Sequence, residues 1–268
     1  MKNKKNNNYS REHLAYLKKN RNKKIIVVLA RALILVIFLG VWELLAQFKV
    51  IDPFIISSPS RVAKTIADLY KGGTLFYHIG VTLMETFVGF AIAIILGYAA
   101  AIILWSSETV RKIAEPYIVV LNSLPKIALG PLIIIWIGTG YDAIIFMTVL
   151  VSIIVCTMNM LSGFIAVDKT KLLLMKSMGA SRATTLRKLI IPASFPTLVN
   201  TLKVAVGLSW IGSIMGEYIV SKAGLGYLIV YGGQVFRLDL VMTATFILCV
   251  LAGGMYGIVT VIEKKITK

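Results

Sequence analysis

The sequence is poor in the residues from which active sites are usually built. Its 268 residues include only two histidines, His13 and His78, and two cysteines, Cys156 and Cys249. Both cysteines lie in apolar stretches, so we expect them to be packing residues rather than a disulfide or metal ligands. The chain has no G-x-x-x-x-G-K-[ST] motif and no Gly-Lys dipeptide, which excludes a P-loop for the phosphates of ATP. The sequence therefore predicts a protein that is not an enzyme and holds no metal or cofactor of its own.

Acidic residues are also scarce, with 12 against 29 lysines and arginines and a formal net charge of +17. That charge alone could indicate a nucleic-acid partner, but 57% of the residues are hydrophobic and the mean hydropathy is +0.82. A soluble domain of this length does not need so much apolar sequence. The chain is therefore predicted to be an integral membrane protein whose surroundings are a lipid bilayer and not a nucleic acid.

Six apolar stretches are long enough to cross a membrane as helices, which predicts an all-α fold. They run at about residues 25–48, 78–105, 113–137, 143–167, 194–220 and 240–262. In the second stretch small residues recur every four positions, a spacing that lets helices pack closely in lipid. These residues are Gly89, Ala93, Gly97 and Ala101. The third stretch contains Pro116, Pro125 and Pro131 and is expected to be broken.

The six spans divide the chain into three parts. Residues 1–24 are expected to form a basic, disordered tail in the cytoplasm. Residues 25–77 hold the first span, which we interpret as an uncleaved membrane helix, and an outer amphipathic helix in SSPSRVAKTIADLYKGG that Gly72-Gly73 ends. Residues 78–268 form a core of five further spans.

The basic residues indicate how these spans are oriented. Twenty of the 29 fall in segments that six spans place on one side, and only six fall in segments on the other side. Cytoplasmic loops carry an excess of lysine and arginine in membrane proteins. Both termini and residues 168–192 are therefore predicted to be cytoplasmic, with residues 49–77 outside.

The cytoplasmic segment 168–192 is too charged for lipid and too regular for a linker. Leu172, Met175 and Met178 recur at helical spacing before Gly179, which is typical of a left-handed helix end. Ser181 can then cap a second short helix that Pro192 closes. Two short helices hinged at a glycine are predicted to dock onto a cytoplasmic partner; an ordinary solvated loop is the alternative.

This segment resembles the coupling loop of ABC-importer permeases, which seats in a groove of the ATPase subunit. Gly179, the following Ala180-Ser181-Arg182 and the end Ile190-Ile191-Pro192 match the family pattern, whereas its Glu-Ala-Ala is replaced by Leu173, Leu174 and Met175. The resemblance implies that an ABC ATPase subunit binds ATP and docks on this loop. The residues that we expect at that contact are Leu172, Met175, Met178, Gly179 and Arg182.

Further strings extend the resemblance to nearly the whole chain from Trp42. Trp42-Glu43-Leu44-Leu45, SPSRV, LNSLPKIALGPLIIIWIGTG and WIGSIMGEYIVSKAGLGYLI are similar to the sulfonate/nitrate/taurine permease family. That family implies a type I ABC-importer permease fold, two permease copies around one pore, an extracytoplasmic solute-binding protein and the plasma (inner) membrane of a prokaryote. It implies import of a small polar anion of the sulfonate, taurine or nitrate type, with a pyrimidine precursor of thiamine as the alternative.

Polar residues inside the spans are candidates for the solute pathway, because a charged residue in a span faces the protein interior or a water-filled cavity. The candidates are Asn122, Lys126, Asn159, Ser209, Ser213 and Glu217. Lys126 is expected near mid-membrane, where it would favour an anionic solute. Two alternatives stay open: the serines and Asn159 serve helix packing, or Lys126 and Glu217 form a structural ion pair.

Two other classes of protein compete with the importer. An ion-coupled transporter or channel needs no ATPase, but it is typically built from paired repeats with broken helices and intramembrane carboxylates, and we find no such repeat. A membrane scaffold would not need polar residues that recur along its spans.

Overall fold

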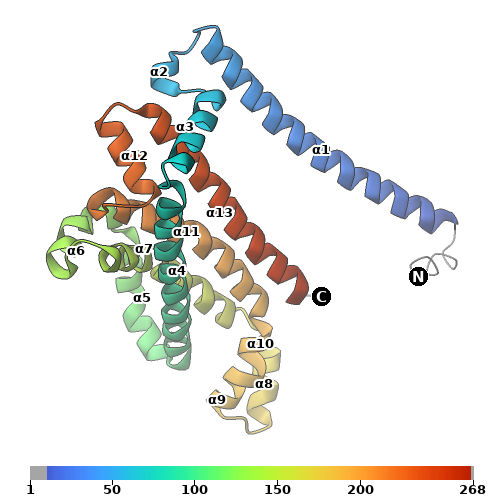
Figure 1. Ribbon diagram of the computed structural model, residues 1–268. Coiled ribbons are helices and arrows are strands. Elements are labelled where there is room, and N and C mark those ends of the chain that lie inside the picture. Colours follow the sequence, from blue (N-terminus) through green and yellow to red (C-terminus); the bar gives the residue numbers. More distant parts are fainter. Residues whose placement is uncertain (1–10, 267–268) are drawn as a thin grey trace. The chain divides into compact units, whose positions relative to one another are not determined.

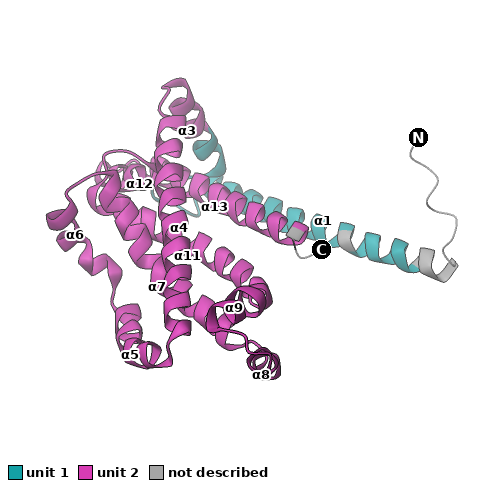
Figure 2. Cartoon of the chain, turned by 90° about the horizontal axis from the view of Figure 1, so that it is seen from below, with its two compact units in different colours: residues 1–63 teal, residues 64–268 magenta. Residues whose placement is uncertain are grey.

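The computed structural model describes residues 11–266, and the regular elements of that range are all helices (Figure 1). The chain divides into two compact units, residues 1–63 and residues 64–268 (Figure 2). Within the described range, five helices are long and apolar enough to cross a membrane, and a sixth crossing is possible if one bent pair of helices counts as a span. The predicted all-α membrane fold is confirmed.

The first unit holds α1 (Arg11–Gln47), α2 (Pro53–Ile56) and the start of α3 (Pro59–Lys71). The predicted first span lies within α1, but α1 begins at Arg11, so the expected disorder is wrong for residues 11–24. That stretch is rich in lysine, arginine and leucine, which are good helix formers, and it extends the helix of the span. Residues 1–10 of the predicted tail lie outside the described range. α3 confirms the predicted amphipathic helix, and Gly73 after it has a φ of +70°.

The carboxylate of Glu43 links α1 to the first turn of α3. Its Oε2 accepts a hydrogen bond from the backbone N–H of Ser60, and its Oε1 accepts one from the Ser60 hydroxyl, both at 2.9 Å. The first backbone N–H groups of a helix have no partner within the helix, and an acidic group there is favourable. Glu43 and Ser60 belong to two of the sequence strings that carried the family resemblance, and this contact joins them.

The centre of the second unit is formed by α4 (Leu75–Ser106), α7 (Tyr141–Ile165) and α11 (Phe195–Val220), which pack closely on one another. Ala93 and Ala101 of α4 are fully buried, and a Cβ added at Gly97 would lie 2.9 Å from the Cβ of Cys156 on α7. A Cβ added at Gly212 of α11 would lie 2.6 Å from the Cα of Thr148. The small residues therefore let the three backbones approach, as their spacing in α4 predicted.

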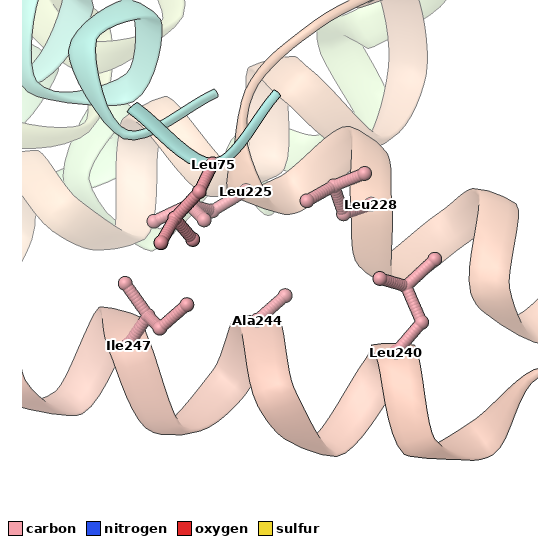
Figure 3. Packing of buried hydrophobic residues seen from close by; sticks show 6 residues of the cluster. All are labelled: Leu75, Leu225, Leu228, Leu240, Ala244 and Ile247. Carbon is pink, nitrogen blue, oxygen red and sulfur yellow. The ribbon is translucent and has the colours of Figure 1, made fainter. Parts of the chain in front are cut away.

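α12 (Leu225–Gln234) covers one end of this core, and α13 (Leu238–Ile266) packs on α12 and on α11. Leu225 and Leu228 of α12 and Leu75 face Leu240, Ala244 and Ile247 on α13 (Figure 3). Further along, the ammonium of Lys203 on α11 pairs with the carboxylate of Glu263 on α13 at 2.6 Å. The sequence predicted the span that α13 forms, whereas the helix α12 was not predicted.

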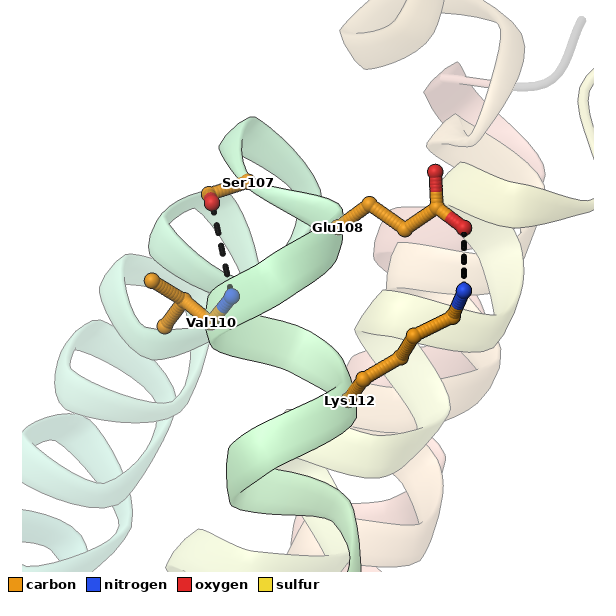
Figure 4. Close-up of polar contacts among 4 residues, drawn as sticks. All are labelled: Ser107, Glu108, Val110 and Lys112. Carbon is orange, nitrogen blue, oxygen red and sulfur yellow. Dashed lines mark hydrogen bonds and ion pairs between the residues drawn. The ribbon is translucent and has the colours of Figure 1, made fainter.

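The third predicted span is broken, as expected, but at only one of its three prolines. It consists of α5 (Glu108–Ser123), the short 3₁₀ helix η1 (Lys126–Leu129) and α6 (Gly130–Ile137), with a bend of 87° between the two parts. Pro125 lies at the break, whereas Pro116 lies inside α5 and Pro131 begins α6. The Ser107 hydroxyl caps α5, and Glu108 pairs with Lys112 one turn on, at 2.9 Å (Figure 4).

The broken helix nevertheless carries the chain from one end of the core to the other. At its start, the Arg182 guanidinium from the 168–192 segment donates to the backbone oxygen of Ser106. At its finish, Tyr141 lines the same cavity as Tyr77 from the opposite end of α4. Counted as one broken crossing, the pair brings the apolar spans of the described residues to six, the number that the sequence predicted.

Candidate functional site

Residues 168–193 form a helical element that lies at the end of the second unit opposite α12 (Figure 1). The element comprises α8 (Lys169–Ser177), α9 (Arg182–Thr185), the π-helix η2 (Leu186–Ile190) and α10 (Ile191–Ala193). Gly179 has a φ of +73°, and the Ser181 hydroxyl accepts a hydrogen bond from the N–H of Thr184 at 3.2 Å. Both the left-handed glycine and the Ser181 cap are therefore confirmed.

Pro192 does not close the second helix, so that prediction is wrong. Helical structure continues through η2 and α10, and the N–H of Ile191 reaches back to the oxygen of Leu186 in the wider π turn. A proline inside a regular α-helix lacks an N–H and clashes with the carbonyl four residues earlier. In a π turn the hydrogen bonds skip one residue more, and this register accommodates Pro192 before α11 begins.

The apolar side chains of α8 divide into an inward and an outward set. Leu172 packs on a buried cluster that includes Phe164 and Ile190, and Met175 is half-buried. By contrast, Leu173, Leu174 and Met178 are 72%, 59% and 74% exposed. The predicted face of Leu172, Met175 and Met178 is therefore not one free surface; the exposed surface lies on Leu173, Leu174 and Met178, which we call the α8 apolar surface.

Arg182 ties this element to the core. Its Nη1 donates to the backbone oxygen of Ser106 at 2.5 Å, at the end of α4. A cavity of about 590 Å³ lies beside it, and Lys169 and Lys176 of α8 and Glu108 of α5 line that cavity together with Arg182. Arg182 of α9 thus attaches the element to the end of α4, beside a hollow that residues of α5 and α8 also line.

The Lys126 side chain closes the end of α5. Its ammonium donates to the backbone oxygen of Asn122 at 2.5 Å, an oxygen that a continuing helix would bond to the N–H of residue 126. A lysine at a helix C-terminus satisfies a free carbonyl and suits the helix dipole. Lys126 is half-buried and the Asn122 side chain is exposed. Among the described residues, no ion pair joins Lys126 to Glu217.

Ser209 and Ser213 of α11 are fully buried between helices. The Ser209 hydroxyl lies 3.3 Å from that of Ser152 on α7, and the Ser213 hydroxyl lies 2.7 Å from that of Thr86 on α4. Asn159 of α7 is half-buried. These contacts favour helix packing, the alternative that the sequence left open, for the two serines.

Glu217, near the end of α11, is 1% exposed and binds the start of α12. Its Oε2 accepts a hydrogen bond from the N–H of Gly226 at 2.6 Å and one from the N–H of Tyr227 at 3.3 Å. Gly224, with a φ of +106°, leaves room for this carboxylate, because an added Cβ there would collide with it. The acidic side chain thus satisfies two free N–H groups at the N-terminus of α12.

Glu85 of α4 is a buried carboxyl group that the sequence analysis did not single out. It is fully buried, its carboxyl group contacts that of Glu217, and among the described residues neither of its oxygens has another hydrogen-bond partner. It shares one face of α4 with Thr82, Thr86 and Gly89. A carboxyl group within an apolar span is itself a signal for a functional site, and this signal was present in the sequence.

The comparisons with known proteins agree with this architecture. Residues 93–268 match the family model described as the binding-protein-dependent transport system inner membrane component. The taurine transport system permease protein TauC of Escherichia coli (strain K12) is 26% identical, over 81% of each chain. The formylaminopyrimidine transport permease protein ThiX of Halalkalibacterium halodurans is 27% identical, over 76% of this chain and 81% of its own length.

Solved structures share the fold at lower identity. The MetNI methionine ABC transporter in an inward-facing conformation has a chain with a TM-score of 0.66 at 18% identity, over 74% of this chain and 98% of its own. A bacterial ABC transporter that imports the acidic polysaccharide alginate has a TM-score of 0.66 at 14% identity, over 95% and 99%. The expected type I ABC-importer permease fold is confirmed. Since the family model covers residues 93–268, the chain belongs to the binding-protein-dependent transport system inner-membrane components, the multi-pass permease subunits of ABC transporters, whose ATPase is a separate subunit.

Proposed function

We propose that, as such a permease subunit, the chain pairs with a second copy, docks an ABC ATPase on α8 and receives its solute from an extracytoplasmic binding protein. The observation that carries the proposal is the α8 apolar surface. Leu173, Leu174 and Met178 expose most of their side chains on an element that lies beyond the spans and carries Lys169 and Lys176. An apolar surface on such a charged helix suits a protein groove better than lipid.

The contacts around α8 support a mechanical role for this surface. α8 leads through Gly179 into α9, Arg182 holds α9 to the end of α4, and η2 continues into α11. A displacement of α8 by the ATPase would therefore act on two of the three central helices at once. Coupling through packed elements of this kind is how small movements at one site reach another.

We propose the orientation that the basic residues indicate, with the termini and residues 168–192 in the cytoplasm. Lys169, Lys171, Lys176, Arg182 and Lys188 all belong to the element that would meet the ATPase. Placing the excess of lysine and arginine on the cytoplasmic side agrees with the positive-inside rule.

For the solute, we propose a small polar anion of the sulfonate or taurine type. Relatives named for taurine and sulfonate transport support that class: TauC, and the putative aliphatic sulfonates transport permease protein SsuC of Bacillus subtilis, which is 22% identical to this chain. ThiX, which is named for formylaminopyrimidine transport, supports a thiamine pyrimidine precursor as the alternative.

The experiment that tests the docking part is capture of the ATPase by the full-length chain in detergent. The wild-type chain should retain one ABC ATPase subunit through size-exclusion chromatography. Met178→Asp should lose it, because a carboxylate would be buried in an apolar groove, whereas Ser177→Asp on the same helix should retain it. Retention of the ATPase by Met178→Asp, or its loss from both variants, would remove the α8 apolar surface as the docking site.

A further inference from the structure

The second unit has a cavity at the α12 end of the core that the proposed function does not use. Its volume is about 220 Å³, well above the roughly 10–15 Å³ that one water needs on the same kind of measure. The start of α4, the turn between α6 and α7, and the segment after α11 together form its wall. Its lining residues include Tyr77, Glu85, Tyr141, Ser221 and Lys222.

The inner wall of this cavity carries an acidic side chain, and no basic side chain of the described residues pairs with it. Glu85 lines it, is fully buried, and its carboxyl group contacts that of Glu217; among the described residues neither of its oxygens has another hydrogen-bond partner. The neighbouring carboxyl of Glu217 is already engaged with α12 through its Oε2. Two buried carboxyl groups in contact repel each other when both are charged, and a charge in a membrane-embedded core is unfavourable without a counter-charge. The site therefore calls for a positively charged or proton-donating group beside Glu85.

The donors and rings around Glu85 favour an ammonium group over a metal ion. The described part of the chain has no group of three or more His, Cys, Asp or Glu side chains that could hold a metal, and hard cations require six or more oxygen ligands. Tyr77 and Tyr141 bring two aromatic side chains to the same cavity, and aromatic faces attract ammonium ions. An ammonium carries three donors, which match carboxylate and hydroxyl oxygens.

A positively charged side chain lies at the exposed side of the cavity. Lys222 lines it and is exposed, unlike Glu85. A solute that enters with an acidic group and an ammonium group would therefore meet a lysine at the rim and a carboxylate inside. Complementary charges placed this way fix the orientation of a bound molecule.

We propose that this cavity binds the ammonium group of a short zwitterionic solute, with Glu85 as its partner and Lys222 as the partner of the acidic group. This inference rests on the proposed function and narrows it: the solute carries an amine as well as an anionic group, as an aminosulfonate or an amino acid does. The cavity lies at the end of the core that the orientation proposed above places outside, where the binding protein would release its solute.

Three probes of nearly equal length distinguish the contributions of the two charges to binding. Taurine carries an ammonium and a sulfonate group, ethanesulfonate carries only the sulfonate, and ethylammonium carries only the ammonium. Each is titrated by calorimetry against the full-length chain in lipid nanodiscs, without ATPase or binding protein. Taurine should bind with the highest affinity, ethylammonium more weakly, and ethanesulfonate not measurably. Glu85→Gln keeps the shape of the side chain and should weaken taurine and ethylammonium binding at least about tenfold, since it removes a charge-assisted contact.

Lys222→Met is the matched variant at the rim. It should weaken taurine binding and leave ethylammonium binding unchanged. Because Lys222 is exposed, this variant should fold, and it therefore tests the proposal even if Glu85→Gln does not fold. Binding of ethanesulfonate as tight as that of taurine, equal taurine binding by wild type and Glu85→Gln, or no binding of taurine and ethylammonium at all would each overturn the proposal. Because these titrations need no ATPase, their outcome does not depend on the importer function. ATP-driven uptake without ammonium binding would support the proposed import and overturn the proposed ammonium site.

Discussion

The carboxylate of Glu217 accepts a 2.6 Å hydrogen bond from the backbone N–H of Gly226 and thereby fastens the end of α11 to the start of α12. On its other side, Glu217 lies beside Glu85 of α4. Further links converge here: the Thr82 hydroxyl of α4 accepts from the N–H of Leu225, and His78 Nδ1 accepts from that of Gly224. α12 is therefore held to two central helices through its first turn.

Gly224→Ala should destabilise this junction. The residue has a φ of +106°, and a Cβ there would collide with the Glu217 carboxylate. Strain of this kind costs about 1–3 kcal/mol, so we expect a lower midpoint of thermal unfolding in detergent.

Gly233→Ala in α12 is the control for that substitution. No atom lies within 4 Å of a Cβ added there, and alanine favours a helix more than glycine does. The control should unfold at the wild-type temperature or above it. Equal destabilisation of both variants would show that the Glu217 junction is not the cause.

Gly212→Leu should disrupt the central packing of α7 and α11. An added Cβ at Gly212 would lie 2.6 Å from the Cα of Thr148, so the two helices would have to separate. Overpacking typically costs 1–3 kcal/mol, and a backbone contact cannot relax by a rotamer change. A Cβ added at Gly207 on the same helix meets no atom within 4 Å, so Gly207→Leu should leave the elution volume and the unfolding temperature unchanged.

Leu172→Asp and Leu173→Asp should have different effects, although the two residues are neighbours: the first should lower stability and the second should abolish ATPase binding. Leu172 packs inward on the cluster of Phe164 and Ile190, so a carboxylate there should lower the stability of the chain itself. Leu173 is 72% exposed, so its substitution should leave the unfolding temperature unchanged and release the ATPase. Thermal unfolding and ATPase capture, measured on both variants, check this. Loss of stability in Leu173→Asp, or intact stability in Leu172→Asp, would contradict the inward and outward assignment.

Gly179→Val should separate docking from coupling. The φ of +73° is unfavourable for a β-branched residue, so the angle between α8 and α9 should change while the α8 apolar surface stays intact. We expect the ATPase to remain bound, with ATP hydrolysis no longer matched by uptake. Normal uptake per ATP hydrolysed would show that the angle at Gly179 plays no part.

The sequence predicted well what short-range chemistry determines. The left-handed Gly179, the Ser181 cap and the end of α3 at Gly72-Gly73 depend on a few neighbouring residues, so their residue types sufficed. The small residues of α4 predicted close packing for the same reason, because their spacing places them on one helix face. The broken third span followed from Pro125.

What the sequence could not supply is the partner of each polar side chain. Ser209 and Ser213 form a polar stripe whether they line a pathway or contact Ser152 and Thr86, and only the helix arrangement separates these cases. Likewise, the partner of Lys126 is a backbone oxygen, which no side-chain pattern marks. Pro192 misled because a π turn cannot be recognised from residue types alone.

The central claim is that this chain moves a solute only when an ABC ATPase is attached to it. The direct measurement is uptake of radiolabelled taurine into proteoliposomes that contain the chain with its co-purified ATPase and binding protein. The account predicts uptake that requires ATP hydrolysis and disappears in proteoliposomes containing Met178→Asp, which lacks the attached ATPase. Equal uptake without ATP or without the ATPase, driven by an ion gradient, would contradict it.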